Sequence, residues 1–247
     1  MAASKTPQTI RRAGAAAGAG ILLITALAVF ANFGVLERLV VEGDANETAR
    51  RITASEGLFR WGIASLFLVA ALDVAVAWAL RVFFAPVHQN MSMLAAWFRL
   101  VYAVVLLVAT SQLPGVLPLV DGATTFGPYP ADPAPVQALS RIDTFHDLWN
   151  AGLILFGIHL LLLGWLAFTS GYVPRALGVL IALAGLGYLV DSFGALASSS
   201  YALDVAVFTF VGEFLLMLWL LAIGRSAAFS KEPPPARGRS RQELSGQ

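Results

Sequence analysis

Four ionisable side chains lie inside long apolar runs of this sequence, and they are the residues best suited to chemistry. Asp73, Arg99, His159 and Glu213 each stand among aliphatic and aromatic residues. An ionisable group in lipid costs several kcal/mol unless it is paired or faces a cavity, so each is a candidate functional residue. Counted from the same ends of their predicted helices, all four fall roughly 12–17 Å deep. We therefore expect one polar layer near the middle of a membrane.

Asp73 and Arg99 lie on consecutive apolar runs joined by a short turn, which predicts antiparallel neighbouring helices. We favour an ion pair that fixes the register of the two helices. A gate or an anion site at Arg99 is the alternative. Small residues and one hydroxyl share the face of Arg99 at helical spacing: Ala95, Ala96, Tyr102 and Ala103. This face predicts that the arginine points into the protein and packs there.

His159 and Glu213 allow several interpretations. We favour a core histidine that is hydrogen-bonded to a carbonyl or to Glu213. A proton relay between the two residues is the sharper alternative, and a metal or haem ligand is a third. Glu213 has Thr209 one helical turn away as a local hydrogen-bond partner. It is either protonated, or paired with His159 or Arg99, or a desolvated carboxyl that transfers protons.

Asp191 is predicted nearer the outer side of the membrane, with Tyr188 one turn before it. Its face carries the small residues Ala184, Gly187, Gly194 and Ala195. Such a face packs against another helix or borders a cavity. For Asp191 itself we favour a capping or interfacial role.

Asp143, His146 and Asp147 share one helix face at the start of an apolar run. With one further ligand this spacing suits a divalent metal. We favour the simpler interpretation, in which Asp143 caps the helix and all three side chains are solvated.

The composition excludes several classes of protein. Hydrophobic residues make up 58% of the 247 residues and charged residues 13%, whereas soluble domains carry about a quarter charged residues. The absence of cysteine excludes disulfides, thiolate metal sites and covalently attached haem. A net charge of +1 argues against a nucleic-acid partner. Hydrolase and phosphate-binding motifs are also absent, so we expect no cofactor.

The hydropathy pattern predicts an all-α, polytopic membrane bundle of six transmembrane helices. Each apolar run reaches the ~20 residues that cross a bilayer. The expected spans are 13–33, 57–84, 91–113, 141–169, 176–197 and 202–224. Residues 1–12 form a polar N-terminal segment, 13–224 the transmembrane domain, and 225–247 a basic, disordered tail.

The segments between the spans carry their own signals. The first span is expected to be retained, because its apolar run exceeds the ~7–15 residues of a signal peptide; a cleaved signal ending near Ala28 is the alternative. Asp44 and Glu47 fit a capping box that starts a short surface helix. Residues 114–140 are rich in proline and glycine and predict an extended loop without a core of its own.

Lysine and arginine collect in alternate loops, which predicts both termini in the cytoplasm. Usage rich in alanine, leucine and glycine indicates a bacterial source and hence the cytoplasmic (inner) membrane. The lipid bilayer is the first expected partner. A small molecule or ion as substrate, a membrane protein partner and a homo-oligomer are further possibilities.

Several stretches resemble the bacterial integral-membrane family catalogued as domain of unknown function 4386. They are SEGLFRWGI (55–63), Leu72-Asp73, WFRLVYAVVL (97–106), FGIHLLLLGWL (156–166), SGYVPRALGVL (170–180) and AGLGYLVDS (184–192). The resemblance covers nearly the whole chain except the tail, and it is weakest at 34–46 and 114–140. It implies a multi-pass helical membrane protein and no particular activity.

Three functions follow as hypotheses. The first is permeation or transport of a proton or small solute through the mid-membrane layer. The second is a non-catalytic scaffold or regulatory subunit whose buried polar groups only specify packing. The third is a membrane-embedded enzyme acting on lipid or quinone, with His159 and a carboxylate as acid and base. Few proline or glycine pairs interrupt the spans, which weighs against the first.

Overall fold

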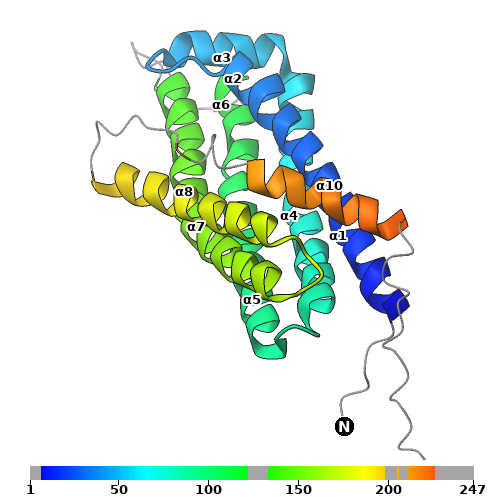
Figure 1. Ribbon diagram of the computed structural model, residues 1–247. Coiled ribbons are helices and arrows are strands. Elements are labelled where there is room, and N and C mark those ends of the chain that lie inside the picture. Colours follow the sequence, from blue (N-terminus) through cyan, green and yellow to red (C-terminus); the bar gives the residue numbers. More distant parts are fainter. Residues whose placement is uncertain (1–6, 122–132, 198–204, 206–210, 226–247) are drawn as a thin grey trace, which may run out of the picture.

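The computed structural model describes residues 7–121, 133–197, 205 and 211–225, and their regular secondary structure is entirely helical, as predicted (Figure 1). Five helical stretches in these ranges are long and apolar enough to cross a membrane. They contain α1 (Pro7–Val29), α4 (Glu56–Phe84), α5 (Gln89–Thr110), α7 (Ala134–Thr169) and α8 (Arg175–Ala197). The chain is therefore a helical, membrane-embedded protein. The last helix, α10 (Val211–Arg225), has 15 residues, so the count of six spans stays a prediction.

The first helical stretch is longer than the predicted 13–33. After α1 the chain continues through a π-helix (Phe30–Leu36) and the short α2 (Glu37–Leu39). The helix α3 (Ala45–Ala54) then lies across this end of the bundle (Figure 1). As expected, Asp44 caps it by accepting a hydrogen bond of 2.9 Å from the backbone N–H of Glu47. The Glu47 side chain bonds Arg50 and Arg51 and does not return to the cap.

The prediction of an extended loop over 114–140 is wrong at both ends of this range, where the chain is helical. A turn of 3-10 helix (Leu113–Val116) and α6 (Leu117–Val120) follow α5, and α7 already begins at Ala134. Proline lies in the first turn of each of these helices, where its missing N–H is not needed. The apolar residues between the prolines supply the core contacts, since Leu113, Val116 and Leu117 are buried. Residues 122–132 lie outside the described residues.

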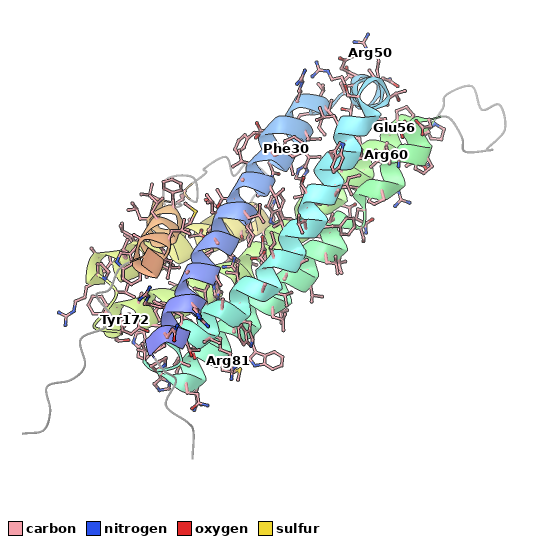
Figure 2. The ribbon with its side chains drawn as sticks, turned by 90° about the vertical axis from the view of Figure 1, so that its right-hand side faces the viewer. Phe30, Arg50, Glu56, Arg60, Arg81 and Tyr172 are labelled. Carbon is pink, nitrogen blue, oxygen red and sulfur yellow. The ribbon has the colours of Figure 1, made fainter. Side chains whose placement is uncertain are left out.

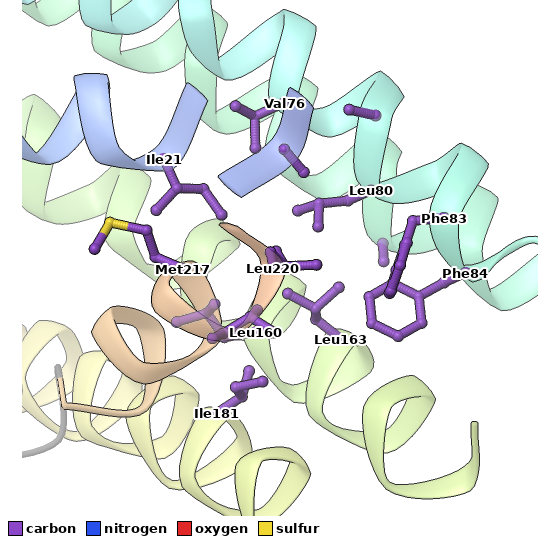
Figure 3. Close-up of a cluster of buried hydrophobic side chains, with 14 of the residues drawn as sticks. Ile21, Val76, Leu80, Phe83, Phe84, Leu160, Leu163, Ile181, Met217 and Leu220 are labelled. Carbon is purple, nitrogen blue, oxygen red and sulfur yellow. The ribbon is translucent and has the colours of Figure 1, made fainter. Parts of the chain in front are cut away.

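Two apolar clusters fill the bundle. The cluster at the α3 end includes Val35, Ile52, Phe59, Leu113 and Ile142. The larger cluster extends from the opposite end to the middle of the bundle and joins α1, α4, α5, α7, α8 and α10; its members toward that end include Phe83, Phe84, Leu163, Ile181 and Leu220 (Figure 3). The half-buried Trp149 packs against both clusters.

The helices α7 and α8 form a hairpin whose backbones touch. Gly157 and Gly164 of α7 face Gly185 and Gly178 of α8, both pairs spaced by seven residues. A Cβ atom added to Gly178 would lie 2.6 Å from the backbone nitrogen of Phe168. The predicted turn between the two helices uses Gly171 at φ +74°, which only glycine adopts without strain. Small residues thus replace large apolar ones along this seam.

The helix α1 uses its G-x-x-x-G pair for packing. A Cβ atom at Gly14 would lie 2.9 Å from the ring of Phe83 on α4, and one at Gly18 would lie 3.0 Å from the backbone of Leu221 on α10. Both helices therefore approach α1 closely.

Charged side chains gather at the two ends of the bundle and leave an apolar belt between them. Arg50, Glu56 and Arg60 lie at the α3 end, whereas Arg81 and Tyr172 lie at the other (Figure 2). Exposed large apolar side chains cover the surface between these ends, among them Leu68, Val104, Leu107, Leu186 and Val190. Such a belt matches the hydrocarbon core of a bilayer.

The glycine seam yields a test of the fold. The variant Gly178→Ala is expected to lower the free energy of unfolding by about 1–3 kcal/mol, because the added methyl group meets backbone atoms that cannot move aside. Thermal unfolding of the purified protein in detergent measures the change. The control is Gly57→Ala, whose added Cβ meets no atom within 4 Å. Equal midpoints for the two variants would contradict the packing described.

Candidate functional site

The turn between α4 and α5 places Asp73 beside Arg99. The helix α4 ends at Phe84 and α5 begins at Gln89, with the His88 Nδ1 capping α5 by accepting from the N–H of Met91 at 3.2 Å. Two antiparallel helices result. The guanidinium of Arg99 donates to the carboxylate of Asp73, and their side chains are 5% and 2% exposed. The structure thus contains the ion pair that the sequence suggests.

His159 of α7 joins this pair through Arg99. Its Nδ1 lies 2.8 Å from the carbonyl oxygen of Ala95, and its Nε2 lies 3.4 Å from the Nη1 of Arg99. A carbonyl only accepts hydrogen bonds, so Nδ1 carries the proton and Nε2 accepts from the guanidinium. The imidazole is therefore neutral and both of its nitrogens are engaged. A direct relay from His159 to Glu213 is not formed in this arrangement.

Arg99 is held on a further side by an aromatic ring. Its guanidinium carbon lies 5.3 Å from the ring centroid of Phe156, within the range of a cation–π contact. Together, Asp73, His159 and Phe156 fix Arg99 from two neighbouring helices. We call Asp73, Arg99 and His159 the buried triad. Its charges compensate one another, because one carboxylate and one guanidinium meet a neutral imidazole.

A cavity of about 200 Å³ lies beside the buried triad. Its lining comes from α1, α4, α5, α7, α8 and α10, so nearly every long helix contributes. Four of the predicted polar residues face it, namely Asp73, Tyr102, Tyr188 and Glu213. Arg99 and His159 are not among the lining residues. The structure therefore divides the predicted polar layer into a buried triad and a cavity that share only Asp73.

Glu213 stands in the first turn of α10 and points one oxygen into buried space. Its Oε1 is buried and has no hydrogen-bond partner among the residues that the structure describes. Tyr188 of α8 lines the same cavity as this carboxyl group. Thr209, the partner expected from the sequence, lies outside the described residues. A buried oxygen atom without a partner is costly in the empty protein and is available to a ligand.

Aromatic side chains form one wall of the cavity. The indole Nε1 of Trp149 donates to the hydroxyl of Tyr102 at 3.0 Å. The ring centroids of Tyr102 and Phe156 are 4.8 Å apart, and those of Phe156 and Tyr188 are 5.4 Å apart. Four rings thus follow one another from α7 through α5 to α8. They all belong to the lining of the cavity.

Trp149 is the lining residue that sequence reasoning missed. Its position near the end of an apolar run predicts an indole at the depth of the outer membrane interface, and the structure adds that its side chain lines the cavity and bonds Tyr102. A usable signal was present, because residues 149 and 156 are seven apart and share a helix face. Phe156 in turn lies one turn from His159, so this face of α7 points at the triad.

The remaining candidates do not join the site. Asp191 is half-buried away from the cavity and accepts a hydrogen bond of 3.1 Å from the backbone N–H of Val205. Asp143 and Asp147 are exposed. No group of three or more histidine, aspartate or glutamate side chains suited to a metal occurs within the described ranges.

The buried triad yields a test by double-mutant cycle. Arg99→Gln is expected to lower the free energy of unfolding by about 3–5 kcal/mol, because it leaves the Asp73 carboxylate buried without its partner. Asp73→Asn combined with Arg99→Gln should cost less than the sum of the two single changes. Thermal unfolding in detergent measures all four proteins. Additive losses would show that the two side chains do not interact.

Comparison with known proteins places this fold in a family. Residues 16–224 match the family described as domain of unknown function (DUF4386). A protein of Archaeoglobus fulgidus, described as an uncharacterized protein, is 36% identical over 165 residues, which cover 67% of this chain and 85% of the relative. No solved structure matches the chain. The matched range contains the whole buried triad and every residue that lines the cavity. The protein therefore belongs to the DUF4386 family.

Proposed function

We propose that this protein binds a small solute in the central cavity and lets that solute, or a proton, cross the membrane. The proposal is carried by the Oε1 of Glu213, which has no hydrogen-bond partner among the described residues and lies at a cavity also lined by Asp73, Tyr102 and Tyr188. Groups of this kind in a membrane protein face the pathway of a substrate or ion more often than lipid. Six helical segments surround the cavity, as a pathway between helices requires.

The buried triad serves this function as a frame. Because each charge in it is compensated, it supports α4, α5 and α7; the Nε of Arg99 is buried without a hydrogen-bond partner among the described residues, but Arg99 does not line the cavity. Glu213 of α10 and Tyr188 of α8 differ from the triad, because both line the cavity. The proposed pathway therefore uses the cavity residues, and Asp73 is the one member of the triad that it reaches.

The cavity is closed toward the end of the bundle that carries Arg81. Phe83 and Phe84 lie beyond Asp73 on α4, Leu163 lies beyond His159 on α7, and Leu220 lies beyond Glu213 on α10 (Figure 3). This dry layer stops continuous passage of water. Passage across the membrane then requires a second conformation in which these side chains separate, as transport by alternating access does.

We further propose six spans with both termini in the cytoplasm of a bacterial inner membrane. Acidic residues outnumber arginines at the α3 end, while Arg12, Arg81 and Arg175 lie at the opposite end, where lysine and arginine mark the cytoplasmic side. The sixth span of this proposal is the apolar run 202–224, which has the ~20 residues that a bilayer needs, and α10 is the part of it that the structure describes.

Topology is tested by thiol labelling, because the chain has no cysteine of its own. In intact cells a membrane-impermeant maleimide should label Arg50→Cys and should spare Arg175→Cys and Gly246→Cys until the cells are permeabilised. Labelling of Gly246→Cys in intact cells would show an odd number of spans.

Transport is tested in proteoliposomes that contain the purified protein. Proton and solute-coupled currents should be present with the wild type and lost with Glu213→Gln, which keeps the shape of the side chain and removes its charge. Glu37→Gln, an exposed position at the α3 end, is the matched control and should leave the current unchanged. Intact current in Glu213→Gln, with its thermal unfolding unchanged, would contradict the proposed pathway.

A non-catalytic scaffold is the second candidate, and the compensated buried triad favours it. Under this alternative the polar groups only fix helix packing, no solute produces a current, and a partner protein copurifies from membranes. We do not propose the lipid- or quinone-modifying enzyme, because its acid and base would need His159. Both nitrogens of that imidazole are engaged, and it does not line the cavity.

A further inference from the structure

The lining of the central cavity has one sign of charge. Asp73 and Glu213 both contribute carboxyl groups, and the described residues of the lining include no lysine, arginine or histidine. Asp73 forms a salt bridge with Arg99, whereas Glu213 forms no salt bridge among the described residues. In a medium of low dielectric constant, an anion entering this space would be repelled and a cation would be attracted.

The aromatic wall also favours cations over anions. The face of an aromatic ring carries partial negative charge and attracts ammonium and guanidinium groups. The lining contains the aromatic residues Tyr102, Trp149, Phe156 and Tyr188, and aliphatic side chains of α1 line the cavity as well. Arg99 already makes such a contact with Phe156 at 5.3 Å. The site therefore combines one carboxylate with several rings, which is the chemistry that recognises alkylammonium groups.

The apolar part of the lining distinguishes an organic cation from a metal ion. Hard metal cations need six or more oxygen ligands or a retained water shell. The cavity offers aliphatic side chains such as Ile21, Leu106 and Leu153 for most of its surface. Methyl and methylene groups around a nitrogen suit that surface, and a volume of about 200 Å³ limits the guest to a small molecule.

We propose that the cavity binds a small alkylammonium cation, with Glu213 as counter-ion and Tyr102, Trp149 and Tyr188 as the aromatic wall. This inference rests on the proposed function and names the substrate class of the same site. The bound cation compensates the charge of the Glu213 carboxylate. Its hydration shell is replaced by contacts with the faces of the aromatic rings.

The experiment compares ligands of equal shape and different charge. Titration calorimetry of the full-length protein in detergent measures binding of choline, tetramethylammonium and tetraethylammonium. The uncharged carbon isostere of choline, in which carbon replaces nitrogen, is the matched control ligand. At least one of the three cations should bind, and choline should bind at least about tenfold more tightly than its isostere, a ratio that corresponds to about 1.4 kcal/mol.

Variants test which residues of the cavity cause the preference for choline over its uncharged isostere. Glu213→Gln should abolish the difference between choline and its isostere, while Glu37→Gln should leave it unchanged. Tyr188→Phe keeps the ring and should retain binding of the cation, whereas Tyr188→Leu removes the ring and should weaken it. Thermal unfolding of each variant shows that the comparison is made between folded proteins.

The results separate this inference from the proposed function. Binding of a cation that depends on Glu213, without flux in proteoliposomes, would support the cation site and overturn transport. Flux that depends on Glu213, with none of the three cations bound, would overturn the cation site and leave transport standing. Equal binding of choline and its isostere would also overturn the cation site.

Discussion

The ion pair between Asp73 and Arg99 is the constraint on which the rest of this bundle depends. Two charges placed in a membrane interior are tolerated only when they meet, and that meeting fixes the register of α4 against α5. His159 then sets the position of α7, because its imidazole spans from the carbonyl of Ala95 to the guanidinium. The glycine seam attaches α8 to α7, and the close contacts of Gly14 and Gly18 attach α1 to α4 and α10. The cavity is what remains where these helices converge.

Much of this arrangement was accessible from the sequence because membrane helices are long, apolar and interrupted by polar residues. The helices over α4, α5, α7 and α8 follow directly from length and hydropathy. The pairing of Asp73 with Arg99 follows from their places on consecutive spans. The helical segments at 113–120 and 134–140 did not follow, because proline suggests a loop unless one knows that it occupies a first helical turn. The direction of Trp149 was missed for a different reason: a tryptophan near a helix end suits the interface and the interior equally, and only tertiary packing decides between them.

The division of the polar layer is the feature that a single sequence could not show. The depth of a residue along a helix follows from counting residues in the sequence, so the same depth was predicted for Asp73, Arg99, His159 and Glu213. The rotation of each helix about its axis is harder to predict from the sequence. This rotation decides which polar groups pair with one another and which face a cavity. Arg99 and His159 turn toward each other, whereas Glu213 and Tyr188 turn toward open space. The same ionisable groups thereby separate into a compensated frame and an uncompensated site.

The short turn between α4 and α5, which ends at the cap residue His88, bears on how the chain enters the membrane. Because only four residues separate α4 from α5, the two helices form a local hairpin that involves no later segment of the chain. Inserting Asp73 or Arg99 alone at mid-membrane would cost about 2.5–3.5 kcal/mol each. Within the hairpin the two charges meet, so the pair carries no net charge. His159 comes later in the chain and contacts the same guanidinium. The neutralising partner of each charge therefore lies on the adjacent helix of the same hairpin and does not depend on a later segment.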